Sequence, residues 1–165
     1  MSFSTISVVG LGYIGLPTAA AFASRQKQVV GVDINAHAVE TINRGEIHIV
    51  EPDLDRVVKK AVDGGFLRAS TTPVEADAYL IAVPTPFKGD HEPDMVYVEA
   101  AAKSIAPVLK KGALVILSPL HLLGLPSRWR SGWPRRVPIL ASRSRRATRP
   151  ISISPTALSA YCQAR

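Results

Sequence analysis

Three glycines near the amino terminus have the residue types and spacing that suit phosphate binding. In the pattern Gly10-Leu11-Gly12-Tyr13-Ile14-Gly15, the first glycine allows a tight turn and the second lets the backbone approach a pyrophosphate. The third lets a helix pack closely on a strand. The backbone N–H groups of Tyr13 and Ile14 would then donate to phosphate oxygens at the positive end of the helix dipole.

Asp33 adds a group that could recognise a ribose. It stands eighteen residues after Gly15, near the separation of about 20 residues at which an acid reaches the adenosine ribose hydroxyls of a dinucleotide. A carboxylate here favours NAD, because it would repel the 2′-phosphate of NADP. Asn35 and Ala36 beside it offer no guanidinium for that phosphate. A glycine turn in an unrelated α/β protein is the alternative interpretation.

The elements that must position these residues alternate between strand and helix. The β-branched run 5–9 predicts a strand that leads into the glycines, and the small apolar residues 16–23 predict the helix that follows. Further strands are predicted at 29–32, 66–70, 78–83 and 113–117, and further helices at 36–44, between Pro52 and Gly64, and at 96–106. Asn35 should cap the helix at 36–44, and Gly45 should end it.

This alternation predicts an α/β fold, a Rossmann-type doubly wound parallel sheet with right-handed crossovers. The strand at 113–117 is apolar throughout, which predicts burial on both faces. Lys110 and Lys111 before it are interpreted as a solvated helix end. The sheet is expected to be incomplete, because no further strand or helix pattern follows residue 117.

The charge is divided unevenly along the chain. The net charge of +7 arises beyond residue 117, because residues 118–165 hold nine arginines but no lysine and no acid, while all thirteen acids lie between Asp33 and Glu99. Residues 1–117 are therefore predicted to form a partial NAD-binding domain. Residues 118–165 are predicted to be an Arg/Ser/Pro-rich, disordered and non-native tail. The abrupt change in composition suggests translation in a shifted reading frame, a hypothesis that sequencing the gene would test.

Other residues offer little chemistry. The four histidines have neither metal-ligand spacing nor a carboxylate partner, so no metal site is predicted. Cys162, the single cysteine, lacks a neighbouring base and is not expected to be a nucleophile. It also rules out an intrachain disulfide framework. No signal peptide or apolar run that could span a membrane is seen, so the chain is expected to be cytoplasmic.

Several motifs together resemble one enzyme family. About residues 1–117 resemble the UDP-glucose/GDP-mannose dehydrogenases. Four segments carry the resemblance: the stretch from Val8 to Pro17, Gly31-Val32-Asp33, Glu51-Pro52-Asp53-Leu54 and Val83-Pro84-Thr85-Pro86. The likeness is greatest to members that oxidise UDP-N-acetyl-D-mannosamine in the synthesis of enterobacterial common antigen.

The resemblance implies NAD as cofactor, a UDP-sugar substrate and a homo-oligomer. It implies cofactor contacts at Gly10, Gly12, Gly15 and the other matching positions, namely Tyr13, Ile14, Asp33 and Thr85. The family oxidises a C6 alcohol to a carboxylate with a cysteine and a lysine that belong to later segments. This chain is therefore expected to have no catalytic residue and to be inactive alone.

Four alternatives stay open at this level. Thr85 could be only a turn residue between two prolines. Glu51 could face the ligand, although a place near a helix N-terminus is favoured. The chain could also be a non-catalytic NAD-binding module, or a weak nucleic-acid binder that uses Trp129, Trp133 and the surrounding arginines.

Overall fold

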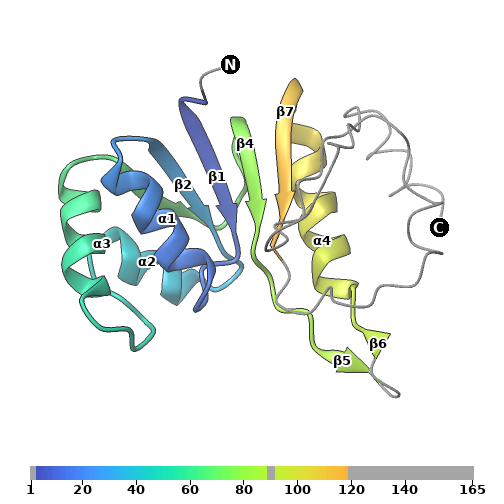
Figure 1. Cartoon of the computed structure of the whole chain (residues 1–165), viewed down its shortest axis with the longest axis horizontal. Helices are drawn as coiled ribbons and strands as arrows, with labels where there is room; N and C mark the ends of the chain where they lie inside the picture. The colour runs from blue at the N-terminus through green and yellow to red at the C-terminus, as the bar shows by residue number, and fades with distance from the viewer. Residues whose placement is uncertain (1–2, 89–91, 119–165) are drawn as a thin grey trace, which may run out of the picture.

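The computed structural model describes residues 3–88 and 92–118, which form a five-stranded parallel sheet flanked by helices (Figure 1). In chain order the elements are β1 (Thr5–Val9), α1 (Gly15–Ser24), β2 (Gln28–Val32), α2 (Ala36–Asn43), α3 (Leu54–Asp63), β3 (Leu67–Ser70), β4 (Ala76–Ile81), β5 (Phe87–Lys88), β6 (Glu92–Pro93), α4 (Val96–Ile105), the 3-10 helix η1 (Ala106–Val108) and β7 (Leu109–Leu117). Apart from Ser118, the predicted tail, residues 118–165, lies outside the described residues.

The sheet has the strand order β3-β2-β1-β4-β7, with every adjacent pair parallel. The chain moves outward from β1 through β2 to β3 and then returns to β4 on the other side of β1. This reversal makes a topological switch point between β1 and β4, and open α/β sheets bind ligands at the carboxyl ends of strands at such a point. The predicted Rossmann-type doubly wound α/β fold is confirmed.

Two apolar cores lie on opposite faces of the sheet. Side chains alternate along each strand, so Val8 of β1 faces one core and Val9 faces the other. Helices α1, α2 and α3 cover the first core, and α4 covers the second. Figure 1 shows α1 to the left of the central strands and α4 to the right, and both helices begin on the lower side of the view, toward which β1 and β4 point.

Tyr79 of β4 lies in the second core and bonds to the backbone at the start of β4 and before β7. Its side chain is fully buried, and its hydroxyl accepts the N–H of Ala76 at 2.9 Å. The same hydroxyl lies 3.1 Å from the Val74 carbonyl and 2.8 Å from the Val108 carbonyl, to which it donates. Burial raises the pKa of Tyr79, so the phenol keeps its proton for this bonding.

One position on the outer edge of β3, Ala69, is hydrogen-bonded by a side chain from α2. Asn43 donates its Nδ2 to the Ala69 carbonyl at 3.0 Å and accepts the Ala69 N–H with its Oδ1 at 2.7 Å. An edge strand with unpaired backbone groups is a site for pairing with another strand, and these two bonds occupy that position.

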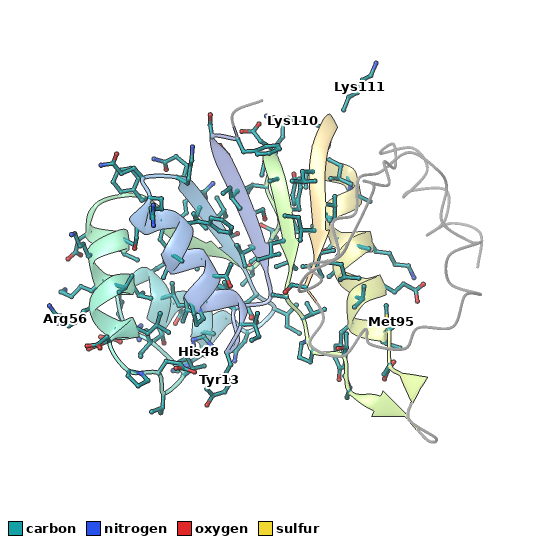
Figure 2. The ribbon with its side chains drawn as sticks, viewed as in Figure 1. Tyr13, His48, Arg56, Met95, Lys110 and Lys111 are labelled. Atoms are coloured by element: carbon teal, nitrogen blue, oxygen red, sulfur yellow. The ribbon has the colours of Figure 1, made fainter. Side chains whose placement is uncertain are left out.

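The fifth strand of the sheet differs from its prediction in length and burial. β7 begins at Leu109 rather than Ala113, so Lys110 and Lys111 lie in a strand and not at a helix end. Lys110 forms an ion pair with Glu75 at 2.9 Å, which raises its pKa, and Figure 2 shows both lysines at the amino end of β7. Burial on both faces is also wrong: Val115 and Leu117 are buried, whereas Leu114 and Ile116 are only half-buried because β7 is an outer strand.

Ser7 at the centre of the sheet leads to a stability prediction. Its side chain is fully buried, and within the described residues its Oγ has no hydrogen-bond partner. Because an unpaired buried hydroxyl is unfavourable, Ser7→Ala is expected to raise the free energy of unfolding by about 1 kcal/mol. Urea denaturation of both proteins measures the change, and a less stable variant would contradict the prediction.

Candidate functional site

The glycine-rich loop follows β1 at the carboxyl edge of the sheet. Gly10 has a φ of +90°, which favours glycine, and a Cβ placed on it would lie 2.8 Å from the carbonyl oxygen of Ala82. Its N–H donates to the Val32 carbonyl at 2.7 Å. The loop therefore crosses the switch point in contact with the ends of both β2 and β4.

Gly12 and Gly15 serve different needs in this loop. A Cβ on Gly15 would lie 1.7 Å from the carbonyl oxygen of Gly10, so only glycine lets α1 start this close to the turn. A Cβ on Gly12 would meet no atom within 4 Å. The protein itself therefore gives Gly12 no steric reason to lack a side chain, and open space over the backbone fits the approach of a pyrophosphate.

The amino end of α1 presents unused donors. Ile14 is the N-cap residue and no side chain caps the helix. In residues 3–88 and 92–118, the N–H groups of Tyr13 and Ile14 have no acceptor, whereas the Leu16 N–H bonds to the Gly12 carbonyl at 3.0 Å. Both side chains are exposed, and Figure 2 shows Tyr13 at the carboxyl edge of the sheet. Such a helix start binds anions through its amides and its dipole.

Asp33 lies directly after β2 beside the glycine-rich loop. Its Oδ2 accepts the N–H of Leu11 at 2.8 Å, and its Oδ1 accepts the N–H of Asn35 at 2.9 Å. Asn35 caps α2 through bonds to the amides of His37 and Ala38, as the sequence predicts. These bonds fix the position of the carboxylate at the same edge as the loop.

Thr85 follows β4 in the turn between two prolines. The threonine is 7% exposed, whereas Pro84 and Pro86 are exposed. Because Gly10 contacts the backbone of Ala82 and Val83, this turn leaves the sheet next to the glycine-rich loop. The structure thus brings all seven predicted cofactor residues to one edge of the sheet.

Two residues of this edge are missing from the sequence-based site, Leu11 and Gly31. Leu11 is fully buried, and a Cβ on Gly31 would lie 2.7 Å from its Cδ2. Gly31 thus leaves room for the loop to lie against β2. A glycine inside the β-branched run 29–32 was the available signal, because such a glycine marks a close approach.

The remaining titratable residues add no second centre in the described part of the chain. No three of its His, Cys, Asp and Glu side chains are grouped to hold a metal ion. His37 is exposed on α2, His48 is half-buried between α2 and α3, and His91, His121 and Cys162 lie outside the described residues. Glu51 is exposed before α3, whose N-cap residue is Asp53.

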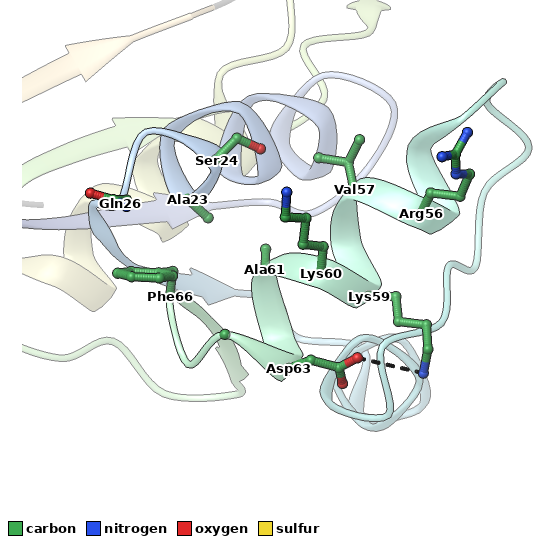
Figure 3. A pocket seen from close by; sticks show the side chains of 11 residues that line it. Ala23, Ser24, Gln26, Arg56, Val57, Lys59, Lys60, Ala61, Asp63 and Phe66 are labelled. Carbon is green, nitrogen blue, oxygen red and sulfur yellow. Dashed lines mark ion pairs between the residues drawn. The ribbon is translucent and has the colours of Figure 1, made fainter.

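An open hollow of about 710 Å³ lies between α1 and α3, apart from the glycine-rich loop (Figure 3). It is lined by Ala23, Ser24, Gln26, Arg56, Val57, Lys59, Lys60, Ala61, Asp63, Gly64 and Phe66. Lys59 pairs with Asp63 at 3.7 Å within it. None of the predicted cofactor residues lines this hollow.

Among the helices of the described residues, none is long and apolar enough to cross a membrane.

Comparison with known proteins gives this edge a context. Residues 4–119 match the NAD-binding domain of the UDP-glucose/GDP-mannose dehydrogenase family. The chain is 85% identical over 124 residues to the UDP-N-acetyl-D-mannosamine dehydrogenase of Escherichia coli K12, covering 75% of this chain and 30% of the relative. It is 80% identical over 133 residues to the enzyme of that name from Salmonella typhi, covering 81% and 31%.

Solved structures agree with these relatives. The UDP-N-acetyl-mannosamine dehydrogenase from Staphylococcus aureus matches with a TM-score of 0.69 and 44% identity, over 70% of this chain and 29% of that one. The Pyrococcus horikoshii enzyme matches with a TM-score of 0.67 and 42% identity, over 70% and 28%. The chain thus spans about a third of the length of the relatives that it matches.

Proposed function

The chain belongs to the UDP-glucose/GDP-mannose dehydrogenase family, and on that premise we propose that it supplies the NAD-binding module of a UDP-N-acetyl-D-mannosamine 6-dehydrogenase. The matched domain is the NAD-binding one, and NAD is its cofactor. The observation that carries the proposal is the carboxyl edge of the sheet, where an uncapped helix start, an open Gly12 and the Asp33 carboxylate lie together.

The phosphates of NAD would lie over the glycine-rich loop. Gly10 and Gly15 hold the loop close to the sheet, Gly12 leaves its backbone accessible, and the amides of Tyr13 and Ile14 donate to phosphate oxygens. No cation is needed for this contact, because backbone amides and the helix dipole supply the positive potential.

The adenosine ribose would lie at Asp33. Each of its carboxylate oxygens accepts one backbone amide and keeps a lone pair for a ribose hydroxyl. The negative charge disfavours a 2′-phosphate, which supports NAD over NADP. Thr85 would contact the cofactor from the turn after β4, close to the loop.

When bound, NAD supplies the hydride acceptor for oxidation of the sugar C6 alcohol to the carboxylate. The product would be UDP-N-acetyl-D-mannosaminuronic acid. The described residues contain no cysteine, so we propose that they bind and orient NAD and that the nucleophile and its lysine partner come from elsewhere. The UDP-sugar, a homo-oligomeric assembly and a cytoplasmic location are parts of the same proposal.

NAD binding by calorimetry tests this function. The chain is expected to bind NAD at least tenfold more tightly than NADP, and Asp33→Ala is expected to weaken NAD binding about tenfold, the loss of one charge-assisted interaction. Glu40→Ala on α2, where Glu40 is exposed, removes the same charge and should leave the NAD affinity unchanged. Absence of NAD binding by the unaltered chain would refute the proposal.

A dehydrogenase assay tests whether the chain only binds NAD or also catalyses the oxidation. NADH formation from UDP-N-acetyl-D-mannosamine is expected to be absent with the chain alone, even where NAD binds. Turnover would show that the catalytic groups are present after all. The nucleic-acid alternative depends on Trp129, Trp133 and arginines that lie outside the described residues, and no feature of the described part favours it.

A further inference from the structure

The glycine-rich loop contacts three consecutive residues, Gly31 and Val32 of β2 and Asp33 directly after it. The N–H of Gly10 donates to the Val32 carbonyl at 2.7 Å, and the next N–H, that of Leu11, donates to Asp33 Oδ2 at 2.8 Å. The fully buried Leu11 side chain lies against Gly31, where any Cβ would collide with it. We call these three contacts the loop anchor.

Asp33 makes the one contact of the loop anchor that uses a polar side chain. Its bond to Leu11 is charge-assisted, and such bonds are roughly twice as strong as neutral ones. The second bond, from the Asn35 N–H to Oδ1 at 2.9 Å, prevents the carboxylate from rotating away. The carboxylate therefore joins the loop before α1 to the first turn of α2.

From this geometry we infer that Asp33 is a positioning residue for the phosphate-binding loop, in addition to the ribose contact proposed above. The inference rests on the proposed function, because it assigns the loop to phosphate. It goes further by making one carboxylate responsible for both ends of the adenosine diphosphate part of the ligand. A change at Asp33 would then disturb phosphate binding even for a ligand that has no ribose.

A consequence concerns cofactor specificity. Replacing Asp33 by a smaller, neutral residue removes the repulsion of a 2′-phosphate, but it also leaves the Leu11 N–H without its acceptor. An unpaired amide next to a fully buried side chain is unfavourable, so the loop would become less ordered. Substitution at Asp33 alone is therefore expected to weaken NAD binding without creating NADP binding.

The first test measures amide hydrogen exchange by NMR on the full chain without nucleotide. In Asp33→Ala, the Leu11 amide is expected to exchange about tenfold faster than in the unaltered chain, and the Asn35 amide should also lose protection. Asp33→Asn removes the same charge but keeps one carbonyl oxygen, which can accept one of the two amides. Its Leu11 exchange should be intermediate.

The second test titrates inorganic pyrophosphate, which has no ribose, while the amide signals of Tyr13 and Ile14 are followed. If Asp33 contacts only the ribose, Asp33→Ala should bind pyrophosphate as well as the unaltered chain or better, since a negative charge is gone. If Asp33 orders the loop, Asp33→Ala should bind it several-fold more weakly, and Asp33→Asn should recover part of the loss.

The Glu40→Ala variant is the control for both tests. Glu40→Ala should change neither Leu11 exchange nor pyrophosphate binding. Unchanged Leu11 exchange in Asp33→Ala, or pyrophosphate binding equal to that of the unaltered chain, would overturn the inference. The exchange measurement needs no cofactor, so failure of the unaltered chain to bind NAD would refute the proposed function and still leave the loop anchor tested.

Discussion

Gly15→Ala is expected to abolish NAD binding and to lower the free energy of unfolding by about 3 kcal/mol. The new Cβ would lie 1.7 Å from the Gly10 carbonyl oxygen, which belongs to the backbone and has no rotamer through which to escape. Either α1 moves away from β1 or the loop changes its path, and both movements displace the amides of Tyr13 and Ile14. Urea denaturation and calorimetry with NAD measure the two effects.

Gly12→Ala is the matched control, because it makes the same chemical change three residues earlier in the motif. A Cβ there meets no atom within 4 Å, and Gly12 is not among the glycines with positive φ, so stability should change by less than about 0.5 kcal/mol. NAD binding should nevertheless weaken, since the methyl group would occupy the approach of the pyrophosphate. Equal stability loss in both variants would contradict the assignment of separate roles.

Tyr79→Phe is expected to lower the free energy of unfolding by about 3 kcal/mol. The change leaves the ring in place but removes the acceptor for the Ala76 N–H and the single O–H that the Val74 and Val108 carbonyls share. All of these groups lie around a fully buried side chain, so water cannot replace the hydroxyl without cost. Chemical denaturation of the two proteins measures the difference.

Tyr97→Phe provides the comparison for this prediction. Tyr97 lies on α4 with an exposed side chain, so loss of its hydroxyl should change stability by less than about 0.5 kcal/mol. A Tyr79→Phe protein as stable as the Tyr97→Phe protein would show that the hydrogen bonds of the Tyr79 hydroxyl contribute nothing net to folding.

The first half of the sheet could be predicted from sequence because its signals are local. Asn35 caps α2 as expected, Gly45 ends the turn after it with a φ of +77°, and the strand before Gly10 has its predicted bounds. In each case the backbone conformation depends on the type of one residue and on neighbours a few positions away in the sequence. The relative placement of Gly10 and Asp33 was predicted from the glycine motif and the spacing of the acid that follows it.

The region after β4 was harder to predict because its structure depends on distant contacts. The Lys110-Lys111-Gly112 stretch has no strand pattern, yet it belongs to β7, where Leu109 pairs with Ala76 and the register then shifts. The hairpin of β5 and β6 was missed because each strand has two residues and one contains a proline. The Leu11 to Asp33 bond was likewise invisible, since backbone amides carry no sequence signature.

The two borders of the sheet differ in a way that limits how copies of this chain could associate. Asn43 occupies the backbone groups of Ala69 on the β3 border, and no side chain of the described residues does the same along β7. Within residues 3–88 and 92–118, β7 is then the border with more open backbone groups, and a further strand would pair more readily there than at β3.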